Sequence, residues 1–299
     1  HNPSLSAVRQ QVEVAAANRE AVAAADAPLL SLSHTARVSD NPLDAFADLL
    51  FTRQVTTQDF VPASLNDPDW SDLYLTRLEV QWPLYTGGEV EAREAQADAA
   101  LDESRARFTR NREQIAFDTM KTYLFAVAAH KAIDIAHDAL KSAQSHADTT
   151  SRLARQGRIV ESDKLAAEVN RAAVDSRYQQ AKTRLKHALN RLGLLMGTTT
   201  QQDIDVHEEW PQVVEADVAL QQLKQDAVAQ RADINAGRDA VRAAASGVEA
   251  ASADDRPKLQ LVARSDWYDD SPGFDSQASS LMAVASFDLY NGATSARVD

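Results

Sequence analysis

Apolar and polar side chains alternate along four segments, at positions 30–38, 74–84, 259–267 and 281–289. A period of two puts neighbouring side chains on opposite faces of a strand, so each segment is predicted to be a strand with one apolar face and one polar, often charged face. Such strands occur in transmembrane barrels, where the apolar face meets lipid and the polar face meets a wet lumen. The alternation also fits a half-buried sheet of a soluble domain, and the pattern alone leaves both readings open.

If the strands cross a membrane, the alternation assigns a face to each residue. The residues expected to face lipid are Leu32, Val80, Ala263 and Phe287. The residues expected to face the lumen are Ser33, Arg77 and Arg264.

A long helical hairpin is predicted between the second and third of these strands. Residues 89–156 contain neither Gly nor Pro over 68 positions and are rich in strong helix formers. A single helix of that length would extend about 100 Å. Its apolar residues recur every seven positions, at Ala126, Ile133, Leu140, Ala147 and Ala154. Gly157 favours a left-handed cap and a second helix runs to about Leu192, which predicts an antiparallel coiled coil with its tip near Gly157.

The chain also repeats itself. Residues 2–38 align without a gap with residues 231–267, a shift of 229 positions, and 12 of the 37 aligned pairs are identical. This repeat predicts a duplication of helix, strand, strand and helical hairpin. We therefore expect a first repeat over residues 1–197, with its hairpin at 89–197, a linker over 198–215, and a second repeat over 216–299 that stops before its own hairpin.

Composition narrows the possible functions. The chain has 44 acidic and 31 basic residues and a net charge of −13, so it has no general attraction for nucleic acid. It contains no cysteine, which excludes disulfides and thiolate sites. The chain contains no run of 18 apolar residues, so no transmembrane helix is expected. The chain opens on His1 without a signal-peptide pattern, so we expect any signal peptide or lipidated first residue to lie outside it, and we treat the chain as a fragment.

No residue pattern points to catalysis, a cofactor or a metal ion. The seven histidines include no pair three or four residues apart, and His207 lacks the second His of a zincin helix. Gly87 and Gly88 are not followed by the Lys of a phosphate-binding loop, and they read as a turn between strand and helix. The chain is therefore not expected to be an enzyme.

Five short motifs, taken in order, resemble the TolC-like outer membrane efflux family. They are Asn2-Pro3-Ser4-Leu5, Ala27-Pro28-Leu29-Leu30, the turn at residues 82–88, the tip at residues 157–165, and residues 192–197. The resemblance covers essentially the whole chain. No single motif is specific to the family, but their order together with the internal duplication is.

The resemblance implies an α+β membrane protein that acts as a homotrimer. Each protomer would give four β-strands to a twelve-stranded transmembrane β-barrel in the outer membrane, and its long antiparallel coiled-coil hairpins to a periplasmic tunnel. The implied function is a passive exit duct of a tripartite efflux pump or a type I secretion system. Its implied partners are outer membrane lipid, a periplasmic adaptor protein and an inner-membrane transporter. Independently, four strands cannot close a barrel, so strands in lipid would require oligomerisation.

The family comparison gives two segments a possible role. Residues 40–72 form a long insertion with a short apolar helix predicted at 45–51, and long barrel loops lie on the extracellular side. The insertion either folds over the mouth of the barrel or is a plain surface loop. The hairpin tip is implied to be the periplasmic gate and the adaptor-docking surface. Its candidate residues are Gly157, Arg158, Ile159, Val160, Ser162, Asp163 and Leu165.

Ser162 and Asp163 have a second possible role. Ser162 could cap the second helix by accepting hydrogen bonds from backbone N–H groups, and Asp163 could be favoured there by the helix dipole. In the family, the matching hydroxyl and carboxylate belong to polar links that hold the periplasmic end closed. The two roles are compatible.

Two rival functions remain open. A periplasmic adaptor also presents a coiled-coil hairpin between β segments, but adaptors lack the duplicated hairpin and the strands with a lipid-compatible face. A cytosolic structural coiled coil would leave the strand periodicity without a purpose.

Overall fold

The computed structural model of the chain describes residues 2–198, 204, 206 and 219–289. The chain divides into two compact units. One, the hairpin unit, comprises His1–Val14 and Asp102–Arg238; the other, the sheet unit, comprises Ala15–Leu101 and Asp239–Asp299. Each unit takes segments from both copies of the sequence repeat. The expected linker at 198–215 lies for the most part outside the described residues, as does the turn at 290–293.

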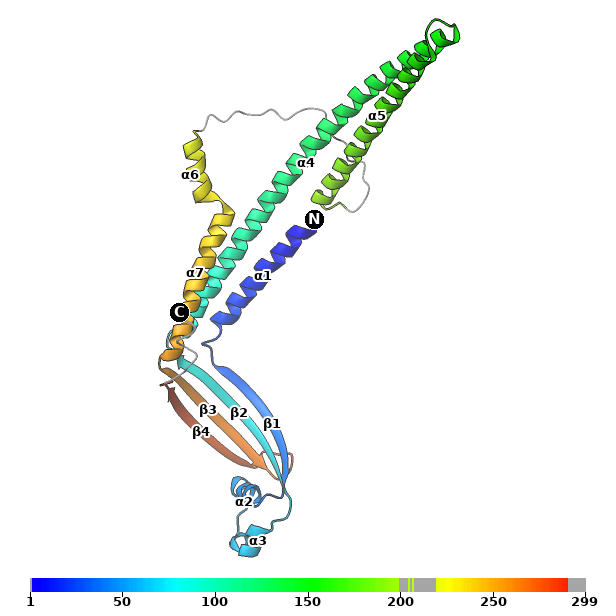
Figure 1. The fold of residues 1–299 in the computed structure, drawn as a ribbon. Coiled ribbons are helices and arrows are strands. Elements are labelled where there is room, and N and C mark those ends of the chain that lie inside the picture. Colours follow the sequence, from blue (N-terminus) through cyan, green and yellow to red (C-terminus); the bar gives the residue numbers. More distant parts are fainter. Residues whose placement is uncertain (1, 199–203, 205, 207–218, 290–299) are drawn as a thin grey trace. The chain divides into compact units, whose positions relative to one another are not determined.

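The sheet unit contains a four-stranded antiparallel sheet in the order β1-β2-β3-β4 (Figure 1). The strands are β1 (Leu29–Ser39), β2 (Ser71–Tyr85), β3 (Lys258–Asp269) and β4 (Ser276–Ser286). The first three contain the predicted segments of period two, whereas β4 begins five residues before its predicted segment and ends three residues before that segment's end, so four strands are confirmed and the bounds of the last are corrected. β-Branched and long apolar side chains at alternate positions suit these residues to a pleated surface with one apolar face.

Two helices reproduce the spacing of the sequence repeat. Helix α1 spans Pro3–Ala23 and helix α7 spans Ala232–Ser252, so both the first and the last residues of the pair are separated by 229 positions. The next strands, β1 and β3, begin at Leu29 and Lys258, which are also 229 positions apart. A further helix, α6 (Leu220–Gln230), precedes α7, and a 3-10 turn, η2 (Ala253–Asp255), follows it.

Helices α4 (Glu89–Arg155) and α5 (Glu161–Met196) form the predicted hairpin (Figure 1). The heptad positions of both helices are buried or half-buried, with Ala126, Ala147, Ala188 and Leu192 among the most buried. The Tyr178 ring lies 5.7 Å from the ring of His137 across the seam. Because small alanines occupy so many of these positions, the two helices can approach closely, and the predicted coiled coil is confirmed.

The long insertion folds into short helices at one end of the sheet (Figure 1). They are α2 (Pro42–Phe51), η1 (Thr57–Phe60) and α3 (Pro62–Asn66). The apolar helix predicted at 45–51 is therefore present but begins three residues earlier. The Asn41 side chain caps α2 by accepting a hydrogen bond from Leu43 N at 2.9 Å, and Pro42 occupies the first helical position.

In the part of the chain that the structure describes, no helix is both long enough and apolar enough to cross a membrane.

Candidate functional site

The register of the sheet sorts its side chains into two chemically different faces. Leu32 lies opposite Leu78, Val80 lies opposite Ala263, and Ala263 lies opposite Leu281. These residues therefore share one face, which we call the apolar face. Leu32 and Leu281 are each 71% exposed, so this chain by itself leaves the face bare. A patch of large exposed apolar side chains marks a surface that something else covers.

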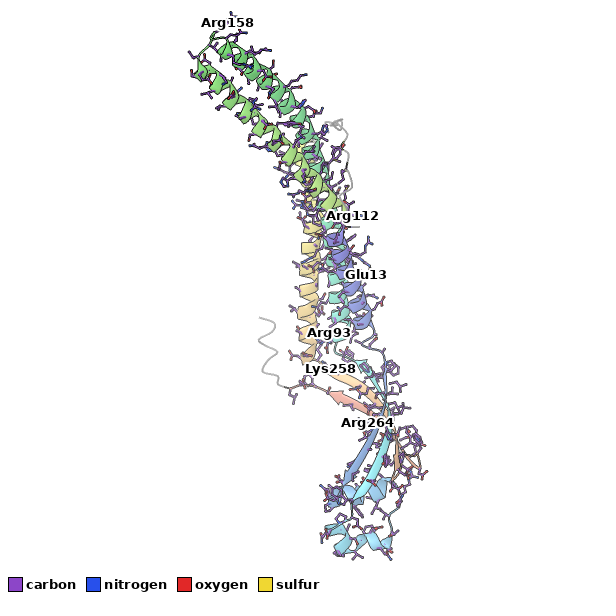
Figure 2. The ribbon with its side chains drawn as sticks, turned by 90° about the vertical axis from the view of Figure 1, so that its right-hand side faces the viewer. Glu13, Arg93, Arg112, Arg158, Lys258 and Arg264 are labelled. Atoms are coloured by element: carbon purple, nitrogen blue, oxygen red, sulfur yellow. The ribbon has the colours of Figure 1, made fainter. Side chains whose placement is uncertain are left out.

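The opposite, polar face carries paired charges. Arg77 donates two hydrogen bonds to Asp266, from Nε to Oδ1 at 2.7 Å and from Nη2 to Oδ2 at 3.0 Å. Arg264, labelled on the sheet in Figure 2, donates to Glu79. Both carboxylates are buried, and the Tyr268 hydroxyl donates a hydrogen bond to Asp266 Oδ2 at 3.1 Å. Bidentate and charge-assisted bonds of this kind hold side chains in fixed positions on this face.

The predicted division between the faces is confirmed for six of the seven strand residues. Leu32, Val80 and Ala263 lie on the apolar face. Ser33, Arg77 and Arg264 lie on the polar face. Phe287 comes directly after the last residue of β4. The ion pairs of the polar face were not predicted, because the sequence does not show which residues of β2 and β3 stand opposite each other.

A segment that we call the strap, residues 42–54, crosses the polar face at the end of the sheet. It contacts all four strands. Arg37 of β1 donates to Asp44 and Asp48, and Ser71 of β2 donates to Asp48 at 2.9 Å. The ring of Phe51 stacks on Tyr268 of β3 with centroids 4.6 Å apart, and Ser276 of β4 donates to Thr52 O at 2.9 Å. The first half of the insertion therefore folds over the polar face.

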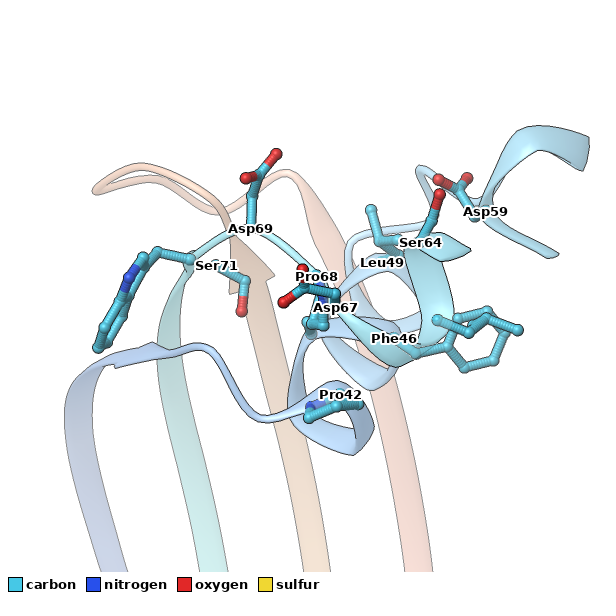
Figure 3. A pocket seen from close by; sticks show the side chains of 12 residues that line it. Pro42, Phe46, Leu49, Asp59, Ser64, Asp67, Pro68, Asp69 and Ser71 are labelled. Carbon is cyan, nitrogen blue, oxygen red and sulfur yellow. The ribbon is translucent and has the colours of Figure 1, made fainter. Parts of the chain in front are cut away.

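Between α2 and α3 lies a cavity of about 410 Å³ (Figure 3). Phe46 and Leu49 contribute apolar lining, and Asp59, Asp67 and Asp69 contribute carboxylates. The Asp59 carboxylate accepts hydrogen bonds from Thr56 N at 2.6 Å and from Thr56 Oγ1 at 2.8 Å. These bonds favour the ionised form and lower the pKa of Asp59. They fix the η1 turn on one side of the cavity.

The hairpin tip is a tight turn closed by backbone hydrogen bonds. Gly157 has a φ of 70°, its N–H donates to Ala154 O at 2.9 Å, and Arg158 N donates to Leu153 O at 2.9 Å. This is the Schellman pattern that ends helices with a left-handed glycine. Figure 2 labels Arg158 at this turn, and its side chain is exposed. The expected role of Gly157 as the cap of the first helix is confirmed.

The capping role expected for Ser162 is wrong. The residue preceding α5 is Val160, which has extended backbone angles and no side-chain capping bond, and Ser162 lies inside the first turn. Asp163 also lies in this turn, where the helix dipole favours its negative charge. Glu161 Oε1 accepts a hydrogen bond from Lys164 Nζ at 2.8 Å. This bond favours the charged ammonium and raises the pKa of Lys164. Within the described residues, the Ser162 and Asp163 side chains make no hydrogen bond or ion pair.

The tip also exposes apolar side chains. Val160 is 62% exposed and Leu165 is 52% exposed. Val169 is exposed one helical turn after Leu165, so these two lie on the same side of α5. Ile159 is half-buried. Val169 was not among the residues singled out from the sequence, although its spacing from Leu165 could have identified it.

The described residues contain no group of three or more His, Asp or Glu side chains placed to hold a metal ion.

Comparisons with known proteins agree with this geometry. The family described as outer membrane efflux protein matches residues 1–198. The outer-membrane channel OprN shares 20% identity with the chain and covers 100% of it with a TM-score of 0.76, over 64% of the OprN chain. The CmeC outer membrane channel of Campylobacter jejuni shares 16% identity over 100% of the chain and 61% of its own length, with a TM-score of 0.80.

A third channel structure gives the same picture. The outer membrane protein VceC of Vibrio cholerae shares 18% identity over 100% of the chain and 70% of its own length, with a TM-score of 0.76. No match was found among curated proteins. The chain therefore has the fold of these channels, and it spans less than two thirds of the OprN and CmeC chains.

Proposed function

Because the chain belongs to the outer membrane efflux protein family, we propose that it is part of a homotrimeric exit duct that carries substrates passively across the outer membrane. The observation that carries this proposal is the two-faced sheet. An exposed apolar face and a face of paired charges suit lipid on one side and water on the other. The role is conduction and gating, so it requires no catalytic group and no cofactor.

The edges of the sheet support assembly. Within the described residues, β1 and β4 each pair with a strand on one side only. In lipid, the free N–H and C=O groups of such edges have no water to bind, so a spanning sheet must close on itself. Four strands cannot form a closed barrel, and three copies would supply twelve.

The helices supply the proposed tunnel and its docking end. We propose that residues 1–197 form one structural repeat and that residues 216–299 begin a second, which would give each subunit two sets of helices. The tip at residues 157–165 would meet a periplasmic adaptor and, through it, an inner-membrane transporter. Exposed Val160 and Leu165 beside charged Arg158 suit such a protein contact.

The adaptor alternative rests on the hairpin alone. Exit ducts and periplasmic adaptors both have a coiled-coil hairpin between β segments. The adaptor function, however, does not explain a sheet whose apolar face is exposed. Lipid contact by that face therefore separates the two functions.

Cysteine labelling tests the proposal, because the chain has no cysteine of its own. Neighbouring positions supply matched variants: Leu32→Cys with Ser33→Cys, and Ala263→Cys with Arg264→Cys. In membranes, a water-soluble maleimide should label Ser33→Cys and Arg264→Cys and leave their neighbours unlabelled. The reverse pattern would show that the faces are misassigned, and equal labelling of all four would show that the sheet is not in a membrane.

The mass of the intact protein in mild detergent gives a second measurement. The trimer is expected, and a folded monomer would exclude the duct.

A further inference from the structure

Helix α2 of the strap has three sides, and two of them are covered within the sheet unit. Ala45 and Asp48 are buried on the side that lies on the sheet. Phe46 and Leu49 line the cavity toward α3 (Figure 3). The residues of the third side, which we call the α2 stripe, are Leu43, Ala47 and Leu50.

The α2 stripe is apolar and points away from the sheet. Leu43 is 77% exposed and Leu50 is 53% exposed. Leu50 follows the buried Asp48 by two residues, which is about 200° around a helix of 3.6 residues per turn. Residues spaced by four and seven positions, as in the stripe, share one side of a helix. A helix that buries two sides and leaves an apolar third side bare presents a contact surface.

The stripe is held in a fixed position because the strap packs on the sheet. Leu73 and Tyr268 belong to the polar face, yet both are buried at the end of the sheet that the strap crosses. The Phe51 ring stacks on Tyr268. Leu73 lies opposite Arg37, and Arg37 donates to Asp48 of α2. The strap therefore covers apolar side chains that would otherwise meet water on this face.

The proposed barrel brings three straps close to one axis. The connection between β3 and β4 spans only residues 270–275, so each chain supplies one strap. Twelve strands about 4.8 Å apart and tilted by about 40° give a barrel of roughly 12 Å radius. A helix with its side chains is about 10–12 Å across, so α2 on the inner wall would reach nearly to the axis. Because each stripe faces away from its own wall, it faces the other two straps.

We propose that the α2 stripes of three copies pack against one another at the axis and constrict the extracellular mouth of the barrel. This inference rests on the proposed function. The partner of each stripe is the same helix of the other copies, because the rotation that closes the barrel brings three identical stripes to one place. Their contact removes from water the apolar side chains that a single copy exposes.

Disulfide formation tests the contact. In Leu43→Cys/Leu50→Cys, the two thiols of one chain are seven residues apart on a helix, about 10 Å, which is too far for a disulfide within the chain. Because the chain has no other cysteine, mild oxidation of the intact protein in membranes should link only separate copies. We expect covalent dimers and trimers on a denaturing gel. The matched control is Thr57→Cys/Asn66→Cys, at exposed positions of η1 and α3, which should leave the copies unlinked.

Access of a bulky reagent from outside the cell tests the constriction. Ser33 lies on the polar face four residues before Arg37, so a thiol in Ser33→Cys reports on the lumen beneath the strap. A maleimide that carries a long polymer chain should label this thiol slowly in intact cells. Adding Leu43→Asp/Leu50→Asp brings like charges together at the axis, so labelling should become about tenfold faster or more. Adding Thr57→Asp/Asn66→Asp is the control and should leave labelling slow.

Three results would overturn the inference. The first is a trimer in which Leu43→Cys/Leu50→Cys forms no covalent link, since the stripe would then be covered by something other than another copy or by nothing. The second is equal linking in Thr57→Cys/Asn66→Cys, which would show only that the insertions collide at random. The third is equally fast labelling of Ser33→Cys by the bulky maleimide with and without Leu43→Asp/Leu50→Asp.

Failure of the inference and failure of the proposed function are distinguishable. A protein that forms no trimer, or in which a small maleimide labels Leu32→Cys and Ser33→Cys alike, contradicts the duct itself. A trimer with the expected labelling of the two faces but without links between its straps contradicts only the contact at the mouth.

Discussion

Arg37 on strand β1 donates a hydrogen bond to the carboxylate of Asp48 on helix α2, and Asp48 is only 4% exposed. Ser71 of β2 donates to the same carboxylate at 2.9 Å. One buried charge is therefore shared by two strands and the strap. Because Arg37 lies on the polar face, this contact holds the strap across the side of the sheet that we assign to the lumen.

Loss of Arg37 should release the strap. Arg37→Ala leaves the buried Asp48 charge without its cation, which should cost roughly 1–3 kcal/mol of local stability. Hydrogen exchange of the amides of Thr52 and Gln54, measured on the intact protein, should then accelerate by about tenfold or more. Arg53→Ala is the control, because Arg53 makes an exposed bond to Gln277 O at 2.8 Å. Equal acceleration in the two variants would contradict the anchoring role of Asp48.

The ion pairs of the polar face should govern ion selectivity. Asp266→Asn leaves Arg77 as an unpaired positive charge in the lumen, so the reversal potential across a planar bilayer should shift toward anion preference. Arg264→Gln leaves Glu79 unpaired and should shift it toward cation preference. The two variants control for each other, and shifts of the same sign would show that these residues do not line the conducting path.

The two glycine turns should differ in their tolerance of a side chain. Gly157→Ala meets no atom within 4 Å, so its cost is the backbone strain of a positive φ, about 1 kcal/mol. In Gly87→Ala the added Cβ would lie 2.8 Å from Arg256 Cβ and 3.1 Å from Ala253 O. Thermal melting should therefore show a clearly larger loss for Gly87→Ala, and an equal loss would mean that the turn between β2 and α4 can adjust.

Substitution of Asp163 at the hairpin tip distinguishes a role in the gate from a role in helix stability alone. If Asp163 forms a charged link to another part of the assembly, Asp163→Ala should loosen the closed state by roughly 0.5–3 kcal/mol and raise its conductance. If Asp163 only complements the helix dipole, the variant should lose about 0.3–1 kcal/mol of helix stability and conduct as before. Single-channel recording of Asp163→Ala and Ser162→Ala separates these results.

Periodicity predicted the parts of the fold that depend on one segment at a time. The heptad of Ala126 and Ala147 identified the buried seam of α4, and alternation placed Leu32 and Ser33 on opposite faces. The shift of 229 positions matched the bounds of α1 and α7 because both copies keep the same helix length before the next strand. Each of these features is set by local side-chain spacing.

Contacts between distant segments could not be predicted from local side-chain spacing. Arg77 and Asp266 are 189 residues apart, and their pairing depends on the register of β2 against β3. A slip of one residue in that register would move the side chains of one strand to the opposite face. Ser162 was assigned a capping role because Ser favours that position, but the chain enters α5 at Val160 directly after the Gly157 turn. The short turn, and not the propensity of one residue, determines where that helix begins.

The order β1-β2-β3-β4 with antiparallel pairing throughout gives the two outer strands opposite directions. When identical copies are arranged by rotation about an axis, β4 of one copy therefore meets β1 of the next as an antiparallel pair, whatever the number of copies. An odd number of strands per chain would instead produce a parallel pair at every boundary, with a different and slightly weaker bonding pattern. In such an arrangement, the even count would make each boundary between subunits equivalent to a pairing inside one subunit, and the sheet of each copy would be completed by its neighbours.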